Sequence, residues 1–325
     1  MLLREPSKAA FDPESVDPET RQVNELVEAA LAAVAPITTQ QPAEIRAARE
    51  EGRGPFPPLV LSPEAEKRTI PGPGGEIGLR IFRRPAARAV YFHIHGGGWT
   101  LGRAHHQDPL LVELADAVPA AVVSVDYRLA PEHPYPAGPD DCEAAALWLV
   151  ENAKRELGTD RLLIGGESAG AHLSVVTLLR LRDRHGYRGF AAANLIYGCY
   201  DLQLTPSVRR WGERNLILST PIVEWFANQF VPLERRGDPD VSPLHADLRG
   251  LPPALFTVGT LDPLLDDSLF MHARWLAAGN EAELAISPDS IHAFNGFPHR
   301  AASEANENAH AFLRARLGSP GQSRG

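Results

Sequence analysis

The chain has 325 residues, 44% of them hydrophobic and 22% charged, and its formal net charge at pH 7 is −9. This composition is typical of a soluble globular protein, and the acidic balance argues against nucleic acid or an anionic membrane surface as a partner, because both would favour a basic patch. Two cysteines, Cys142 and Cys199, provide no disulfide framework and fit a reducing cytoplasm, and we expect neither a targeting segment nor membrane insertion.

The first 60 residues are rich in proline, glutamate and alanine. We predict one amphipathic helix in this segment, because apolar residues recur with i, i+3, i+4 spacing. Its apolar face would consist of Val23, Leu26, Val27, Ala30, Leu31 and Val34. Two strands are predicted next, over residues 66–70 and 77–82, and the prolines and glycines of residues 71–75 between them indicate a hairpin.

From residue 90 onward, strand and helix patterns alternate. Strands are predicted over residues 90–94, 120–125, 162–164, 192–197, 254–260 and 283–287. Helices are predicted over residues 110–117, 140–157, 168–182, 267–278 and 302–317. This alternation predicts an α/β fold with a mostly parallel sheet covered by helices on both faces. An aromatic-rich helical segment at about residues 200–240 interrupts it, either as a pair of core helices or as a substrate-facing cap.

A glycine run follows the strand predicted over residues 90–94, in the sequence HGGG at residues 95–98. Consecutive glycines let the backbone approach a reacting oxygen closely, so that bare N–H groups can point at developing negative charge. Taken alone, the glycines are also explained by a tight loop after a strand. The sequence GESAG at residues 166–170 favours the catalytic interpretation, because the two motifs in this order are rare by chance.

The GESAG sequence lies where a predicted strand ends and a helix begins, which is the context of a nucleophile elbow. Ser168 would project its hydroxyl at the N-terminus of that helix, and the Ala169 N–H would help to hold an oxyanion. Serine is a weak nucleophile, so a base must be present.

We expect the base and its acidic partner downstream, after late strands. His292 follows the strand predicted over residues 283–287 and the turn-forming residues 288–289. The competing histidines lie in loops or helices, where solvent-facing or packing roles are expected: His245, His272, His299 and His310. Asp262 follows the strand over residues 254–260 directly, whereas an acidic helix N-terminus is enough to explain Asp266 and Asp267. The order Ser, Asp, His is that of α/β hydrolases.

The expected chemistry is acyl transfer. Ser168 attacks an ester carbonyl, His292 takes its proton, Asp262 fixes the imidazole tautomer, and water then releases the acyl group. No cofactor or metal is needed. His93 and His95 lie on one strand, but no further residue has zinc-like spacing to them, so we expect no metal site.

These motifs resemble those of the hormone-sensitive-lipase-like group (bacterial family IV) of α/β hydrolases. Further matching stretches are DYRLAPE at 126–132, SPL at 242–244, LPPA at 251–254, DPL at 262–264 and HAF at 292–294, so that the resemblance covers roughly residues 65–317. It implies an α/β-hydrolase fold and a cofactor-free serine carboxylesterase that acts on short-chain acyl esters, often as a homodimer. It also implies oxyanion N–H groups at Gly97, Gly98 and Ala169 and an orienting role for His95.

The resemblance further implies a helical cap built from the N-terminal segment and an insertion. We therefore expect cap segments at residues 1–60 and 200–240, and a hydrolase core at residues 61–199 and 241–325. Glu167, His172 and Asp289 depart from the usual residues of the group, which bears on the pocket and its substrate.

Other functions use the same motifs. An amidase, deacetylase or lactonase would need the same triad, and the sequence does not separate them. Some relatives are receptors that have lost the triad histidine, and His292 argues against that function. An interfacial lipase would require an exposed apolar lid.

Overall fold

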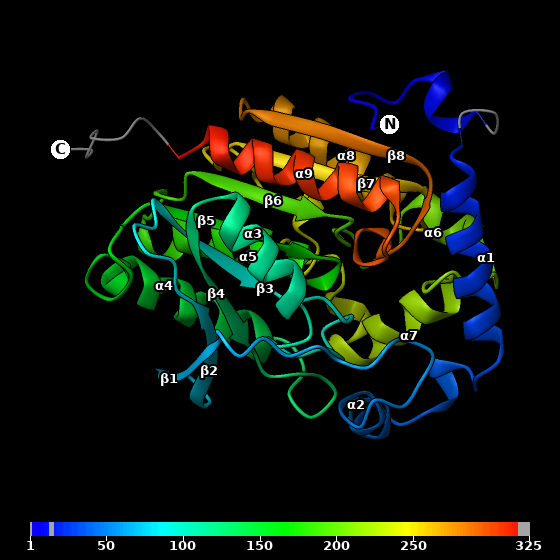
Figure 1. Ribbon diagram of the computed structural model, residues 1–325, viewed down its shortest axis with the longest axis horizontal. Coiled ribbons are helices and arrows are strands. Elements are labelled where there is room, and N and C mark those ends of the chain that lie inside the picture. Colours follow the sequence, from blue (N-terminus) through cyan, green and yellow to red (C-terminus); the bar gives the residue numbers. More distant parts are fainter. Residues whose placement is uncertain (1, 13–15, 318–325) are drawn as a thin grey trace.

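The computed structural model describes residues 2–12 and 16–317. An eight-stranded sheet crosses the molecule (Figure 1), in the order β1-β2-β4-β3-β5-β6-β7-β8. Its strands are β1 Glu66–Gly72, β2 Gly75–Phe82, β3 Ala89–Ile94, β4 Ala120–Asp126, β5 Leu162–Glu167, β6 Ala192–Ile196, β7 Ala254–Leu261 and β8 Ala282–Ile291. β2 pairs antiparallel with β1 and β4, and the other pairs are parallel. The α/β-hydrolase fold class expected from the sequence is confirmed.

Helices cover both faces of the sheet. The helices of the described chain are α1 Pro18–Ala32, α2 Pro42–Glu50, α3 Asp108–Ala117, α4 Ala137–Leu157, α5 Ala169–His185, α6 Pro206–Trp211, α7 Thr220–Phe230, α8 Leu265–Ala277 and α9 Arg300–Ala315. α3 and α9 lie on one face, and α4, α5 and α8 pack on the other (Figure 1). None of these helices is long and apolar enough to traverse a bilayer.

The central strands form because both of their faces are buried. All residues of β3, β5 and β6 are buried, which explains their nearly continuous apolar sequences. Successive side chains enter opposite layers: Tyr91 packs with α3 and α9, whereas Phe92 packs with the larger core beneath α4 and α5. Because β3 to β8 run parallel, their carboxyl ends all lie at one edge of the sheet, where the candidate residues gather.

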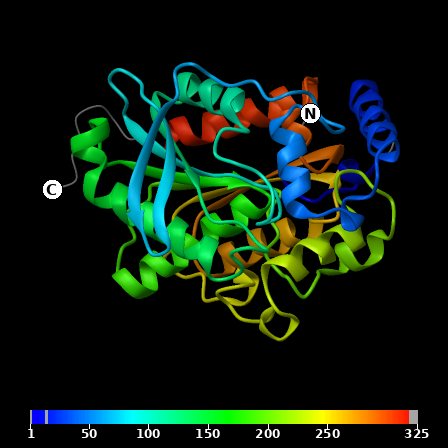
Figure 2. The same ribbon diagram turned by 90° about the horizontal axis from the view of Figure 1, so that it is seen from below.

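The remaining helices gather at that edge. α1, α2, α6 and α7 lie together at one end of the sheet (Figures 1 and 2). The helix predicted within residues 1–60 is present as α1, and its predicted apolar face is right in part: Val27 is buried and Val23 and Leu31 pack against the core, whereas Leu26 is 63% exposed. The buried face also holds Asn24, whose side chain donates to the Asp289 carbonyl at 2.7 Å.

β8 also differs from the prediction. The strand runs on to Ile291, so Pro288 and Asp289 form no terminating turn. Asp289 takes φ +54° inside the strand, and its N–H donates to the Thr260 hydroxyl at 2.8 Å, beside a register shift between β7 and β8. The pairing of β7 and β8 is therefore irregular just before His292.

Candidate active site

A strained turn carries Ser168 between β5 and α5. Ser168 has φ +56° and ψ −119°, a conformation that few non-glycine residues adopt. Its glycine neighbours are needed because β3 passes close by: a Cβ on Gly166 or Gly170 would lie 2.0 or 1.9 Å from the Ile94 carbonyl oxygen. Close packing of β3 against the turn thus places Ser168 at the N-terminus of α5.

Asp262, His292 and Ser168 lie in one hydrogen-bonded chain. His292 Nε2 is 3.0 Å from Ser168 Oγ, and His292 Nδ1 is 2.8 Å from Asp262 Oδ2. Both the histidine and the aspartate are buried. Because an ionised carboxylate only accepts hydrogen bonds, Asp262 selects the tautomer with the proton on Nδ1, which leaves Nε2 free to accept the serine proton.

Two further contacts hold this chain in place. The other Asp262 oxygen, Oδ1, accepts the Leu264 N–H at 2.9 Å, so the carboxylate cannot rotate freely. The Tyr197 ring lies against the His292 imidazole, with ring centroids 4.6 Å apart. The competing histidines find other partners; His299, for example, contacts the Phe294 carbonyl.

The glycine run forms a loop beside Ser168. Gly97 and Gly98 have φ +105° and +58°, and both line the same cavity as Ser168. Neither of their N–H groups has an acceptor among the residues that the structure describes. Side chains are excluded at both positions, because a Cβ would lie 2.4 Å from the Leu101 carbonyl oxygen at Gly97 and 2.2 Å from the Phe226 ring at Gly98.

His95 braces the start of this loop. Its Nδ1 donates to the Gly96 carbonyl at 2.8 Å, and its ring stacks on Tyr127 with centroids 4.2 Å apart. The Tyr127 hydroxyl donates to the His95 carbonyl at 2.9 Å. Burial lowers the pKa of His95 to about 3, so the imidazole stays neutral and keeps its role as a fixed donor.

His172 holds Trp99 of this loop in place, a role that the sequence did not indicate. Its Nδ1 accepts the Trp99 indole N–H at 3.0 Å, and its Nε2 donates to the Val241 carbonyl at 2.7 Å. Phe230, the last residue of α7, stacks on Trp99 with centroids 4.7 Å apart. Burial lowers the pKa of His172 to about 4, which preserves the neutral acceptor.

Asp267 was expected only to place negative charge at a helix N-terminus, but it also binds a distant segment of the chain. It is fully buried and accepts the N–H groups of Tyr200 and Asp201 at 2.6 and 2.9 Å, and the Thr205 hydroxyl at 2.6 Å. Its neighbour Asp266 accepts the Ser207 N–H at 2.8 Å. The two carboxylates therefore anchor the segment that leads from β6 into the cap. Their partners lie about sixty residues away, which explains why local sequence did not reveal them.

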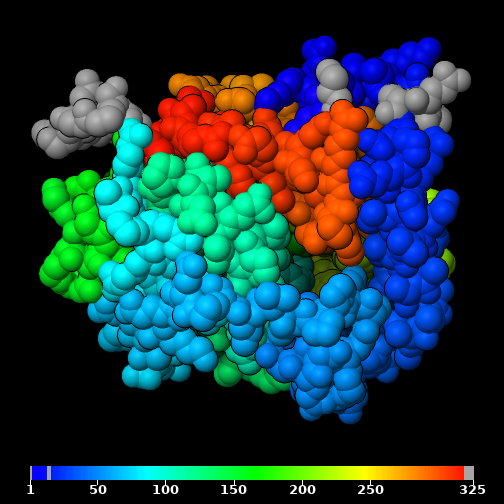
Figure 3. All heavy atoms as spheres, viewed as in Figure 1, coloured from blue at the N-terminus to red at the C-terminus, as the bar shows by residue number. Residues whose placement is uncertain are grey.

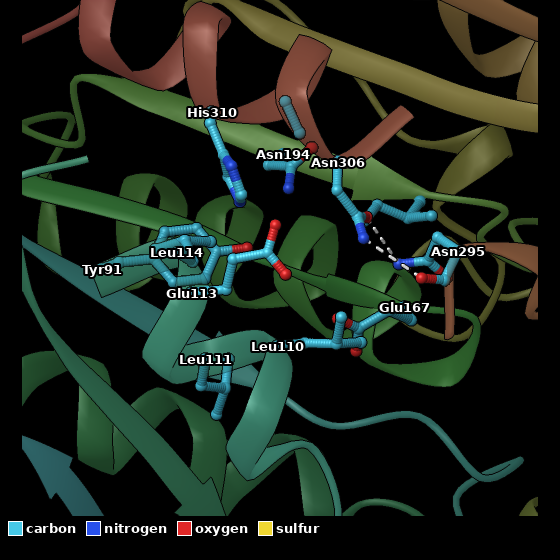
Figure 4. A pocket seen from close by; sticks show the side chains of 12 residues that line it. Tyr91, Leu110, Leu111, Glu113, Leu114, Glu167, Asn194, Asn295, Asn306 and His310 are labelled. Carbon is cyan, nitrogen blue, oxygen red and sulfur yellow. Dashed lines mark hydrogen bonds between the residues drawn. The ribbon is translucent and has the colours of Figure 1, made fainter. Parts of the chain in front are cut away.

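A water-sized cavity with both polar and apolar lining residues lies behind the nucleophile turn. It has a volume of about 30 Å³, and Glu167, Asn194, Asn295 and His310 are among its lining residues (Figure 4). The Glu167 carboxylate also contacts His93 Nε2, at 3.0 Å. Such a volume admits water and no substrate.

The substrate-sized cavity lies on the other side of Ser168. It has a volume of about 520 Å³, and both Ser168 and His292 line it. Leu218, Ile222 and Phe226 close it from the insertion, which favours the substrate-facing interpretation of this segment over a plain core helix pair. The N-terminal residues close it from the opposite side, and the surface in Figure 3 is hollowed between the blue N-terminal segment and the orange segment after β8.

Comparisons with known proteins find esterases and a matching fold family. A family profile described as alpha/beta hydrolase fold matches residues 91–296. The chain is 37% identical to "Carboxylesterase NlhH" of Mycobacterium tuberculosis, over 87% of this chain and 92% of that protein, and 29% identical to an "Acetyl esterase" of Salmonella schwarzengrund, over 80% and 83%.

Solved structures are similar as well. A hyperthermophilic esterase from the archaeon Pyrobaculum calidifontis superposes with a TM-score of 0.83 at 30% identity, covering 92% of this chain and 99% of that one. A hormone-sensitive lipase from a metagenome library gives a TM-score of 0.81 at 29% identity, with 93% and 99% covered.

Proposed function

Because the chain belongs to the α/β-hydrolase fold family, in its hormone-sensitive-lipase-like group, and is a carboxylic ester hydrolase, we propose that Ser168, His292 and Asp262 cleave short-chain acyl esters through an acyl-enzyme. The observation that carries this proposal is the continuous hydrogen-bonded chain from Ser168 Oγ through His292 to Asp262. A nucleophile, its base and an orienting carboxylate in hydrogen-bond reach are what this chemistry requires.

In the first half-reaction, Ser168 Oγ attacks the ester carbonyl while His292 Nε2 takes the hydroxyl proton. The imidazolium that forms is stabilised by Asp262, and it then gives its proton to the leaving alcohol. In the second half-reaction, His292 takes a proton from water, the hydroxide attacks the acyl-enzyme, and the acid is released as Ser168 recovers its proton.

The N–H groups of Gly97, Gly98 and Ala169 are the proposed donors to the negative oxygen of both tetrahedral intermediates. Two features support the assignment: Gly97 and Gly98 line the cavity, and Ala169 begins α5, whose N-terminus favours negative charge. Such preorganised donors are each worth about 10²–10³ in rate. His95 is proposed to orient this loop through the Gly96 carbonyl.

The cavity supports a small, largely apolar ester as the substrate. The α7 residues Ile222 and Phe226, which help to line the cavity, are buried, an arrangement unlike the exposed apolar lid of an interfacial lipase. The contact between His292 and Ser168 argues against a receptor that only binds.

The cap assignment also stays a proposal. We assign residues 1–60 and 200–240 to the cap and residues 61–199 and 241–325 to the core, supported by the position of α1, α2, α6 and α7 (Figure 1). A homodimer and a cytoplasmic location stay predictions, which sedimentation velocity and cell fractionation would test.

The test compares Ser168→Ala with the matched change Ser303→Ala on α9. We expect Ser168→Ala to lose p-nitrophenyl acetate hydrolysis and fluorophosphonate labelling while keeping its circular dichroism spectrum, and Ser303→Ala to keep all three. Hydrolysis of p-nitrophenyl esters from two to twelve carbons should fall as the acyl chain lengthens. Turnover by Ser168→Ala would disprove the assignment, and higher rates on amides or lactones than on esters would replace the substrate class.

A further inference from the structure

Three potential metal ligands meet at the rim of the large cavity. The Glu50 carboxylate lies 3.0 and 3.1 Å from His105 Nε2 and 2.8 Å from His106 Nε2. The three ligand atoms all lie within 4.8 Å of one another, and no other such group occurs among residues 2–12 and 16–317. His106 also lines the cavity, whereas Glu50 and His105 stand outside it.

The geometry suits a small tetrahedral cation. Ligands about 2.0–2.1 Å from a Zn²⁺ ion sit roughly 3.3 Å apart, so the carboxylate needs to move only a few tenths of an ångström from each imidazole, and the two imidazole nitrogens, within 4.8 Å of each other, need to reach the same spacing. All three groups are accessible enough for this adjustment, since their side chains are between 16% and 44% exposed. Three protein ligands leave a fourth position open to water, which the partly exposed site can supply.

The chemistry of the ligands selects the metal. Two imidazoles and one carboxylate suit Zn²⁺ and its borderline neighbours, whereas Mg²⁺ and Ca²⁺ prefer oxygen ligands.

The site lies between α2 and the loop that follows the glycine run, so a bound ion would connect the two. Glu50 is the last residue of α2, and His105 and His106 lie in the loop between the glycine run and α3; Figure 2 shows α2 against this loop. Pro42 is the one buried residue of α2, so polar contacts hold the helix to the core. Arg46 donates to the Thr100 and Ala130 carbonyls at 2.8 and 3.4 Å and pairs with Glu132.

We propose that Glu50, His105 and His106 bind one Zn²⁺ ion, or a similar divalent transition-metal ion, which fastens α2 to the loop after the oxyanion glycines. The bound ion holds the cap closed over the cavity and slows exchange of substrate and product. It takes no part in bond cleavage. Metal binding is independent of the proposed function, and only the effect on turnover rests on it.

The test uses the full-length chain without a histidine tag, stripped of metal by chelation and titrated with ZnCl₂ by calorimetry. We expect saturable binding of one Zn²⁺ per chain, no binding of Mg²⁺, and a melting temperature that rises with Zn²⁺. Glu50→Gln and His105→Ala should each weaken binding by more than about tenfold, since even the loss of outer-shell partners costs 10–100-fold. The matched control is His245→Ala, which removes an exposed histidine paired with a single carboxylate and should bind Zn²⁺ like the parent.

Two further measurements separate the parts of the proposal. A crystal grown with Zn²⁺ should show an anomalous peak between Glu50 and the two histidines, and Zn²⁺ should slow ester turnover by the parent but not by Glu50→Gln. Absence of saturable binding, equal affinity in Glu50→Gln and His105→Ala, or a peak elsewhere would overturn the site. Binding at this site with unchanged turnover in a protein that hydrolyses esters would overturn its control of the cap alone.

Discussion

A methyl group added at Gly98 should cost both stability and catalysis, because this glycine combines two constraints. Its φ of +58° lies in the left-handed region, where alanine is disfavoured by about 1–2 kcal/mol. Its Cβ would also lie 2.2 Å from the Phe226 ring, so the ring must retreat by roughly 1.3 Å to an ordinary separation of about 3.5 Å. Overpacking of this kind costs about 1–3 kcal/mol, so we expect Gly98→Ala to lose about 2–5 kcal/mol in all.

Gly158 provides the matched control. It ends α4 with φ +84°, and a Cβ there would meet nothing within 4 Å. Gly158→Ala should therefore lose only the backbone part, about 1–2 kcal/mol, and keep its full activity. Chemical denaturation gives the free energy of unfolding of both variants, and hydrolysis of p-nitrophenyl acetate gives kcat/KM.

The loss of activity in Gly98→Ala depends on whether the glycine loop or the Phe226 ring moves. If the loop yields instead of the ring, the Gly98 N–H leaves the oxyanion, and kcat/KM should fall by about 10²–10³. Adding Phe226→Ala to Gly98→Ala removes the clash and should restore part of the activity. A Gly98→Ala protein as stable and as active as Gly158→Ala would refute both the contact with the cap and the role of this N–H.

Two further predictions concern the triad and His172. Asp262→Asn should keep the fold but lower kcat by about 10⁴, because an amide donor selects the wrong imidazole tautomer; a loss below tenfold in steady-state kinetics would remove Asp262 from the triad. His172 has a pKa of about 4 in the folded protein, below its unfolded value of about 6.5, so its contribution to stability is complete above pH 6.5 and is lost as the pH falls towards 4. The difference in unfolding free energy between the parent and His172→Asn should accordingly shrink by about 3 kcal/mol over this interval in denaturation curves, and a pH-independent difference would contradict the assignment.

Sequence alone predicted the features that depend on local pattern. The nearly continuous apolar strands predict a parallel sheet. The sequence GESAG after such a strand predicts the turn at Ser168. The order of Asp262 and His292 along the chain follows from the same strand pattern, because each residue comes just after a strand end.

The missed features depend on partners far away in the chain. The apolar period in α1 suggested a buried Leu26, but Leu26 is exposed and the buried face includes Asn24, which bonds to the distant Asp289 carbonyl. Asp267 looked like an ordinary helix-start residue until its contacts with Tyr200 and Thr205 were known. Pattern within one segment carries no information on such contacts.

The pairing of the leader with β8 bears on when this protein can first act during synthesis. Leu3 exchanges backbone hydrogen bonds with Ile286, and Asn24 reaches Asp289 across 265 residues. At about 5–20 residues per second, the ribosome needs roughly 13–50 seconds to make the second partner of the latter pair after the first. During that time the leader has no strand to join, and the strand that delivers His292 does not exist. With His292 as the proposed base, the nascent chain stays inert towards esters until that residue has been made.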